Sequence, residues 1–228
     1  MKKRVVVISL GGSQIIPDDV NYKYLEKFKE IVLRNIKNYK IVVVCGGGSL
    51  ARKYIRAVSN SGGNVYLQSL SGINATRANA RFLSYFFGFD LDWGVPDRLR
   101  TVKKYLNKRN LVICGGLEYK PNQTSDSTAA SLASKFGADF INLTNVKGLF
   151  DKDPRKFKNA KFVSSISWTS FDKIVSKIKF KPGEHFVLDQ TASKIILKNK
   201  IKTYIMKDLS QLEKFFNGKD FVGTKIAG

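Results

Sequence analysis

The chain has 228 residues, of which 43% are hydrophobic, enough to bury a substantial core as one large domain or two closely joined lobes. No apolar run approaches the roughly 20 residues that span a bilayer, and Met1-Lys2-Lys3-Arg4 leads directly into a strand, so we expect a cytoplasmic protein without a signal peptide. The formal net charge of +22 comes from residues spread along the whole chain. This distribution favours a basic solvated surface that attracts anionic substrates, and nucleic acid is not an expected partner.

Residues for disulfide or metal chemistry are few. Cys45 and Cys114 each end an expected buried strand, so we interpret both as apolar core residues rather than a disulfide or metal pair. With His185 as the single histidine, a zinc site is not expected, and we identify no metal-ligating residue.

Hydrophobic periodicity predicts alternating strands and helices along the chain. A strand over residues 5–10 precedes a helix that Pro17-Asp18-Asp19 opens. The elements that follow are a strand over 41–45, a helix over 50–58, a turn at 61–64, a helix over 72–87, a short strand over 91–93, a helix over 96–106, a strand over 111–114, a helix over 125–136, a strand over 140–143, an exposed hairpin or loop over 151–161, helices near 167–178 and 191–198, a strand over 201–206 and a helix over 209–216. This order predicts an α/β fold, a three-layer α/β/α sandwich with a mostly parallel central sheet and no dividing linker.

Three of the predicted strands run into glycine-rich turns, namely Gly11-Gly12-Ser13, Gly46-Gly47-Gly48 and Gly115-Gly116. One such turn is as often a packing device as a binding site, but parallel strands place all three along one edge of the sheet. Glycine lets the backbone approach an anion closely, and the first N–H groups of the following helix lack internal partners. We therefore expect a ligand with several phosphates at this edge, with Arg52 as a phosphate-binding cation.

Longer segments carry a family resemblance in collinear order. They are GGGSLARKYI at 46–55, GINATRANA at 72–80, PNQTSDSTAA at 121–130, TNVKGLFDKDP at 144–154, VLDQTASKII at 187–196 and GTKI at 223–226. The chain resembles the amino acid kinase superfamily, and within it the archaeal-type uridylate kinases. The resemblance implies the amino acid kinase fold, transfer of the γ-phosphoryl group of ATP to UMP with Mg²⁺, and a homo-oligomer, a hexamer built as a trimer of dimers. It also implies one domain over 1–228, with an acceptor-binding part at about 1–120 and a nucleotide-binding part at about 121–228.

The resemblance also implies roles for individual residues. For catalysis it points to Gly12, Ser13, Asp126 and Lys147. For UMP binding it points to Gly46, Gly47, Gly48, Arg52, Gly72, Thr76, Thr124 and Ser125. For ATP binding it points to Gly11, Gly12, Ser13, Thr144, Asn145, Gly148, Phe150 and Asp153. The phosphate of UMP is already anionic at neutral pH, so we expect Asp126 to orient charged groups rather than to act as a base.

Some of these positions have plainer interpretations. Asp126 fits the first turn of a helix, where the helix dipole favours an acid, and Asp189 fits a helix N-cap that needs no catalytic role. Phe150 fits the core equally well, and a polar helix surface accounts for Arg77 and Asn79.

Three positions depart from the family pattern. Ser9 stands where many members place a lysine that neutralises charge in the transition state, and Ser69 stands where uridylate kinases commonly place an aspartate. Lys147 replaces the aspartate of the usual Val-Asp-Gly, and our hypothesis is that it supplies the missing cation. Two alternatives to a UMP kinase stay open: a superfamily kinase acting on another small acid or phosphate, and a non-catalytic oligomeric protein that binds nucleotides or oxyanions.

Overall fold

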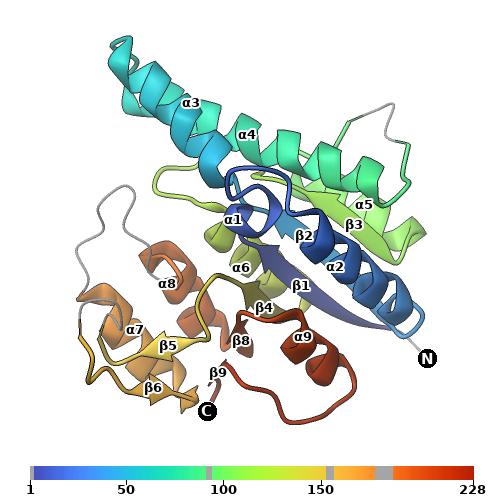
Figure 1. Ribbon diagram of the computed structural model, residues 1–228, viewed down its shortest axis with the longest axis vertical. Helices are drawn as coiled ribbons and strands as arrows, with labels where there is room; N and C mark the ends of the chain where they lie inside the picture. The colour runs from blue at the N-terminus through green and yellow to red at the C-terminus, as the bar shows by residue number, and fades with distance from the viewer. Residues whose placement is uncertain (1–2, 91–93, 153–156, 178–186) are drawn as a thin grey trace.

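The computed structural model describes residues 3–90, 94–152, 157–177 and 187–228. Its central sheet has the strand order β3-β2-β1-β4-β8-β9-β7 (Figure 1). The five strands on one side of this order are parallel: β1 (Arg4–Leu10), β2 (Tyr39–Cys45), β3 (Leu111–Cys114), β4 (Asp139–Leu143) and β8 (Thr203–Met206). β9 (Thr224–Ile226) runs antiparallel to β8, and β7 (Ser165–Ile166) runs parallel to β9. The predicted mostly parallel sheet is therefore confirmed.

The sheet separates two hydrophobic cores. Successive side chains of a strand point to opposite faces, so Ile8 and Leu10 lie in one core and Val7 in the other. Cys45 and Cys114 also belong to different cores, and both are buried free thiols. The two cysteines are thus apolar core residues, as the sequence predicts.

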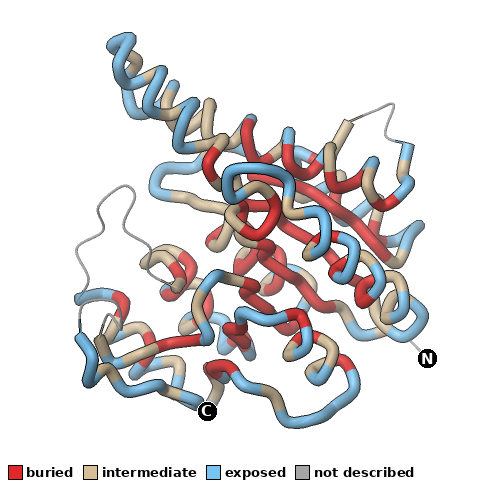
Figure 2. The backbone as a smooth tube through the Cα atoms, viewed as in Figure 1, coloured by how far each residue is buried: buried red, intermediate tan, exposed pale blue. Residues whose placement is uncertain are grey.

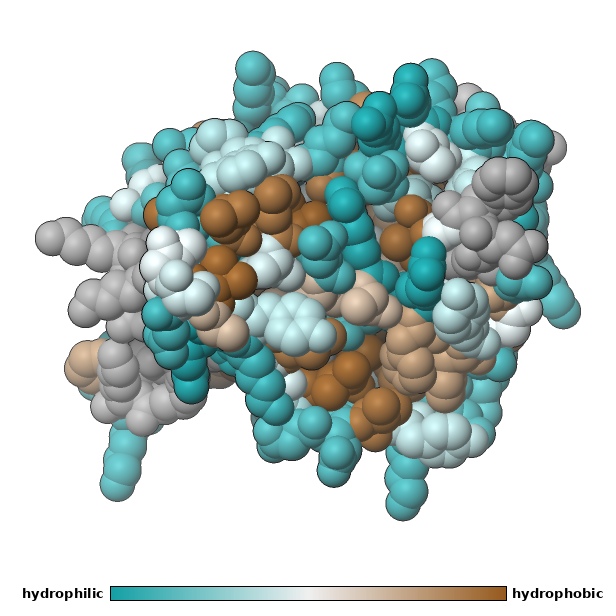
Figure 3. Space-filling view, turned by 90° about the horizontal axis from the view of Figure 1, so that it is seen from above, coloured by the Kyte–Doolittle hydropathy of each residue, from teal (hydrophilic) through white to brown (hydrophobic). Residues whose placement is uncertain are grey.

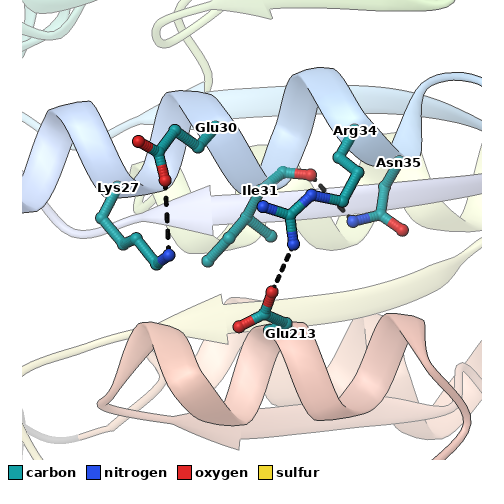
Figure 4. A network of polar contacts seen from close by, with 6 residues as sticks. All are labelled: Lys27, Glu30, Ile31, Arg34, Asn35 and Glu213. Atoms are coloured by element: carbon teal, nitrogen blue, oxygen red, sulfur yellow. Dashed lines mark hydrogen bonds and ion pairs between the residues drawn. The ribbon is translucent and has the colours of Figure 1, made fainter.

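One face of the sheet is covered by α2 (Tyr22–Asn35), the C-terminal half of α4 (Val65–Phe86) and α9 (Leu209–Phe216) (Figures 1 and 2). An ion pair joins α2 to α9, with 2.5 Å between Arg34 Nη1 and Glu213 Oε1 (Figure 4). Exposed pairs of this kind contribute at most about 1 kcal/mol, whereas each fully buried leucine or phenylalanine contributes about 1.5–3 kcal/mol. Packing of the apolar faces therefore holds these helices on the sheet.

The other face is covered by four helices, α5 (Leu99–Lys108), α6 (Ser125–Phe136), α7 (Trp168–Ser176) and α8 (Gln190–Asn199). α6 lies against β1 at the centre of this layer, and its alanines Ala129, Ala130 and Ala133 are fully buried. Small side chains let the helix approach the strands closely. The predicted three-layer α/β/α sandwich is confirmed, and among the described helices none is long and apolar enough to cross a membrane.

Several element boundaries differ from the prediction. The turn α1 (Gly12–Ile15) was not predicted, and α2 begins at Tyr22 rather than at Pro17. α3 spans Gly48–Asn60, and α4 begins at Val65 instead of residue 72, because the side chain of Asn64 accepts a hydrogen bond from the backbone N–H of Leu67 at 3.0 Å. α5 begins three residues later than predicted, and the predicted strand at 91–93 lies outside the described residues.

A small hairpin extends from the end of β4. β5 (Leu149–Phe150) pairs antiparallel with β6 (Phe162–Val163), and the rings of Phe150 and Phe162 meet edge to face with centroids 5.5 Å apart. The backbone N–H of Asp151 donates to the carbonyl of Lys161 at 3.1 Å. The prediction of a hairpin or loop over 151–161 is confirmed for its described residues. The strands β5 and β6 themselves were not predicted, because two residues are too few to show a hydrophobic pattern.

Candidate active site

The glycine turns after β1 and β2 press their backbones against each other at the carboxyl edge of the sheet. The N–H of Gly46 donates to the carbonyl of Leu10 at 2.8 Å, and the N–H of Gly11 donates to Leu143 at 3.0 Å. A Cβ atom on Gly46 would lie 2.5 Å from the nitrogen of Gly12, and one on Gly12 would overlap the backbone of Gly48. Only glycine fits these positions, so packing alone requires part of the motif that suggested phosphate binding.

The same turns still present donors to a ligand. Among the described residues, the N–H groups of Gly12, Ser13, Gly47 and Gly48 find no acceptor. Gly48 has a φ of +59°, which turns the backbone sharply at the start of α3. Arg52 follows one turn later and is exposed. Adjacent free N–H groups beside a guanidinium are a suitable cradle for phosphate oxygens.

Side chains of α4 fasten the turns in place. Asn79 Nδ2 donates to the carbonyls of Gly46 at 2.8 Å and Gly47 at 3.3 Å. Arg77 donates from Nε to the carbonyl of Gly116 and from Nη2 to that of Leu117, both at 2.9 Å. By resemblance both residues match the helix that flanks the uridine pocket, with a polar helix surface as the plainer interpretation; that plainer interpretation is wrong for Asn79, which is buried and holds the glycine triplet.

Two predicted UMP contacts on α4 already have structural partners. Thr76 is buried, and its Oγ1 accepts the N–H of Gly116 and donates to the carbonyl of Ile73, both at 2.6 Å. Gly72 faces α3, where a Cβ atom would lie 3.0 Å from Cδ1 of Ile55. Ser69 Oγ donates to the carbonyl of Val65, one turn earlier in the same helix, at 2.8 Å. Direct contact of Thr76 and Gly72 with UMP stays a prediction.

Two carboxylates meet beside the glycine turns. Ser9 Oγ, on fully buried Ser9 of β1, donates to Asp126 Oδ1 at 2.7 Å. Thr124 Oγ1 caps α6 by accepting the N–H groups of Asp126 at 3.1 Å and Ser127 at 3.4 Å, and it donates to Asp189 Oδ2 at 2.5 Å. Asp189 in turn caps α8, with Oδ1 accepting the N–H of Ala192 at 2.8 Å. The start of α6, which carries Asp126, is thus tied to the start of α8. The two residues that join them, Thr124 and Asp189, lie 65 residues apart in sequence.

The surroundings of Asp126 disfavour its charged form. The pKa of Asp126 is raised from its ordinary value to about 7, mainly by burial and also by the nearby carboxylate of Asp189, while the hydrogen bond from Ser9 acts in the opposite direction. No described lysine or arginine forms an ion pair with either carboxylate. An acid with a strongly shifted pKa close to free backbone N–H groups is a pattern typical of functional sites.

The loop after β4 carries the residues predicted for ATP. The N–H of Thr144 donates to the carbonyl of Met206 at 3.0 Å, while Asn145 and Lys147 are exposed. Gly148 is buried against Thr224, and a Cβ atom at this position would lie 2.5 Å from Oγ1 of Thr224, so no larger residue fits there. Asp153, also predicted for ATP, lies outside the described residues.

Thr224 joins the hairpin to the sheet. Its Oγ1 accepts the N–H of Leu149 at 2.8 Å and donates to the carbonyl of Val163 at 2.6 Å. The segment GTKI therefore ends the fold by clamping both strands of the hairpin. Sequence reasoning recognised the motif without assigning it a role, because the partners lie 75 and 61 residues away along the chain.

The described residues contain no group of three histidine, cysteine, aspartate or glutamate side chains that could hold a metal ion.

Comparisons with known proteins agree with this architecture. Residues 4–207 match the model of the amino acid kinase family. A uridylate kinase from Thermococcus onnurineus is 34% identical over 94% of this chain and 96% of its own length, and one from Methanobrevibacter smithii is 33% identical over 97% and 98%. The crystal structure of uridylate kinase from Archaeoglobus fulgidus superposes with a TM-score of 0.85 at 33% identity, covering 97% of this chain and 99% of that one.

Proposed function

The chain belongs to the amino acid kinase family, and we propose that it is a UMP kinase, which transfers the γ-phosphoryl group of ATP to UMP and yields UDP and ADP. One observation carries the proposal: two glycine turns with free N–H groups meet at one edge of the sheet, next to Asp126. The relatives that match almost end to end are named uridylate kinases, which supports UMP as the acceptor.

The reaction needs two phosphate groups held in line. A phosphate oxygen of UMP attacks the γ-phosphorus of ATP, and the bond from that phosphorus to the β–γ bridging oxygen breaks, so that ADP leaves with the electron pair. We assign the acceptor phosphate to Gly46, Gly47, Gly48 and Arg52, and the transferred group to the turn at residues 11–13. Because these two turns touch each other, both phosphates would be held close together with little motion of the protein.

Asp126 and Thr124 complete the acceptor side of the proposed site. The phosphate of UMP needs no base, so the carboxylate of Asp126 serves to orient donors and cations around the reacting groups. Thr124 caps α6 and Ser125 is its first residue, at the end of the helix where backbone N–H groups lack carbonyl partners within the helix. Gly72 and Thr76 shape the wall of this pocket through α4.

The donor side consists of the loop after β4 and the hairpin that follows it. We assign the base and ribose of ATP to Thr144, Asn145, Gly148, Phe150 and Asp153. Mg²⁺ is expected to arrive as Mg-ATP and to neutralise charge between the phosphates. Lys147, exposed in the same loop, is our candidate for the cation that Ser9 does not provide.

We also propose that the chain functions as a homo-oligomer, with the hexamer as the expected state. α4 exposes large apolar side chains, with Val65 74% and Tyr85 52% accessible. Figure 3, which looks down on the upper side of Figure 1, shows apolar groups among hydrophilic ones on this part of the surface. Light scattering would test this, since a monomer at micromolar concentration contradicts the proposal.

The division into an acceptor part at about 1–120 and a nucleotide part at about 121–228 is likewise proposed, and one sheet spans both.

A coupled ADP-release assay with Mg-ATP tests the proposed function. The acceptors are UMP, CMP, dUMP, AMP and isopentenyl phosphate, each over a range of concentrations. We expect robust turnover with UMP and much weaker turnover with the others. Turnover with another acceptor alone identifies a different kinase of the family, and ATP binding without any turnover favours a nucleotide-binding protein.

A further inference from the structure

A chain of hydrogen bonds crosses the centre of the site and joins β1, α6 and α8. It runs from Ser9 Oγ to Asp126 Oδ1 at 2.7 Å, from the N–H of Asp126 to Thr124 Oγ1 at 3.1 Å, and from Thr124 Oγ1 to Asp189 Oδ2 at 2.5 Å. From the residues alone, Ser9 only marks the position of an absent lysine, and Asp189 fits a helix N-cap. The structure connects both residues to Asp126.

Ser9 approaches Asp126 from the strand. Its side chain is fully buried, and a buried hydroxyl must find a partner or lose about 1–3 kcal/mol. A carboxylate can only accept, so Ser9 is the donor in this bond, and a donor of this kind stabilises the ionised form of the acid. Ser9 therefore fixes the direction of the Asp126 carboxylate and also favours its negative charge.

Asp189 approaches from the opposite side with the opposite effect. Both of its oxygens are occupied, one by the N–H of Ala192 and the other by the hydroxyl of Thr124. These two bonds hold the carboxylate of Asp189 in place, and its negative charge disfavours a second one on Asp126. The contact with Thr124 also sets the start of α6, from which Asp126 projects.

We propose that Ser9 and Asp189 are positioning residues that act on Asp126 from two sides, Ser9 favouring its carboxylate form and Asp189 opposing it. The inference rests on the proposed role of Asp126 in phosphoryl transfer. With both neighbours in place the pKa of Asp126 is about 7, so at neutral pH a change in either neighbour alters the charged fraction strongly.

Other charged groups do not compete for Asp126. α6 packs against β1, β2, β4 and α8. The remaining charged side chains on these elements lie at the far ends of the strands or on exposed helix surfaces: Arg4, Lys40, Lys135, Asp139, Lys194 and Lys198. In the part of the chain that the structure describes, Asp189 is the one charged residue whose field shifts Asp126.

The test compares Ser9→Ala with Asp189→Asn in the full chain. The pH dependence of kcat/KM for Mg-ATP reports groups of the free enzyme, and the ionisation of ATP is common to all variants. We expect the acid limb to move upward by about one pH unit in Ser9→Ala and downward by about one unit in Asp189→Asn, as expected for the loss of one hydrogen bond or one charge near a carboxylate. Ser9→Thr, which keeps the hydroxyl, should retain the wild-type limb.

Ser193→Ala is the matched control. Ser193 is also fully buried and donates to a carboxylate, that of Asp172 at 2.8 Å, so its removal costs the same kind of bond away from Asp126. The acid limb of the kcat/KM profile of Ser193→Ala should lie at the same pH as that of the wild type. Thermal unfolding of each variant shows that the folded state is being compared.

A carbon-13 NMR titration of the aspartate carboxyls in the free protein gives a readout that needs no activity. Opposite movements of the Asp126 resonance in the two variants support the inference. Movements in one direction, or none, overturn it. Asp126→Asn separates the two proposals: full turnover in that variant defeats the catalytic role of Asp126, while the titration still decides whether Ser9 and Asp189 act on it.

Discussion

The two halves of the carboxyl edge are built by different means. On the acceptor side, glycine backbones touch each other, and α4 holds them with Asn79 and Arg77. On the donor side, a side-chain hydroxyl bridges distant segments, as that of Thr224 does for the two strands of the hairpin. The acceptor half is therefore intolerant of added atoms, whereas the donor half is intolerant of lost polar groups.

The largest expected effect is that of Gly12→Ala. The new Cβ would overlap the backbone of Gly48, which cannot move aside as a flexible side chain could. We expect a loss of about 4 kcal/mol or more in the free energy of unfolding, measured by urea denaturation. Gly137→Ala is the control, because Gly137 has a φ of +58° but open space around it, and its strain costs about 1–2 kcal/mol. Equal losses in the two variants would contradict the account.

The next effect is a gain in stability from Asp126→Asn. The folded pKa of about 7 lies above the ordinary value of 3.8, so the folded state binds the proton more tightly and loses stability as pH rises between these values. The difference corresponds to about 4 kcal/mol as an upper bound. Urea denaturation should find the variant more stable than wild type at pH 8, with the advantage disappearing near pH 4. A gain that does not change with pH would mean that ionisation is not its cause.

A pair of substitutions tests the two halves separately. Asn79→Ala and Thr224→Val each leave buried backbone groups without their partner, at a cost of about 1–3 kcal/mol. We expect Asn79→Ala to raise KM mainly for UMP and Thr224→Val to raise KM mainly for ATP. Steady-state kinetics with each substrate varied in turn measures the split, and a rise in the same KM for both variants would remove the distinction between the halves.

The smallest effect is expected from Lys147→Ala. Lys147 is exposed, so its loss should leave stability unchanged, while kcat/KM for ATP falls about tenfold, equivalent to about 1.4 kcal/mol in the barrier. Lys161→Ala, an exposed lysine of the following hairpin, controls for loss of general positive charge. Unchanged turnover and ATP affinity in Lys147→Ala would remove the idea that it replaces the missing cation.

The sequence predicts the acceptor half well because its signals are local. An apolar strand followed by consecutive glycines predicts both the strand end and a turn that approaches a neighbour closely. The predicted starts of helices are less accurate. α4 begins at Val65, directly after its cap Asn64 and seven residues before the predicted start. Propensity alone does not show which of several polar residues becomes the cap.

The hydrogen-bond network around Asp126 could not be predicted to the same degree because its contacts are long-range. Ser9 and Asp126 are 117 residues apart, and no periodicity connects a serine in a strand to an acid at the start of a helix. Asp189 was correctly identified as an N-cap, but its second oxygen and its contact with Thr124 depend on how α6 and α8 pack. Residues that act through another side chain are visible only when the packing is known.

A crystal structure of the chain with UMP and a non-hydrolysable ATP analogue would show where both phosphates bind. We expect the UMP phosphate on the N–H groups of Gly47 and Gly48 near Arg52, and the γ-phosphate at Gly12 and Ser13, with Asp126 beside them. UMP bound away from the glycine triplet, or a γ-phosphate remote from the turn at residues 11–13, would contradict this expectation.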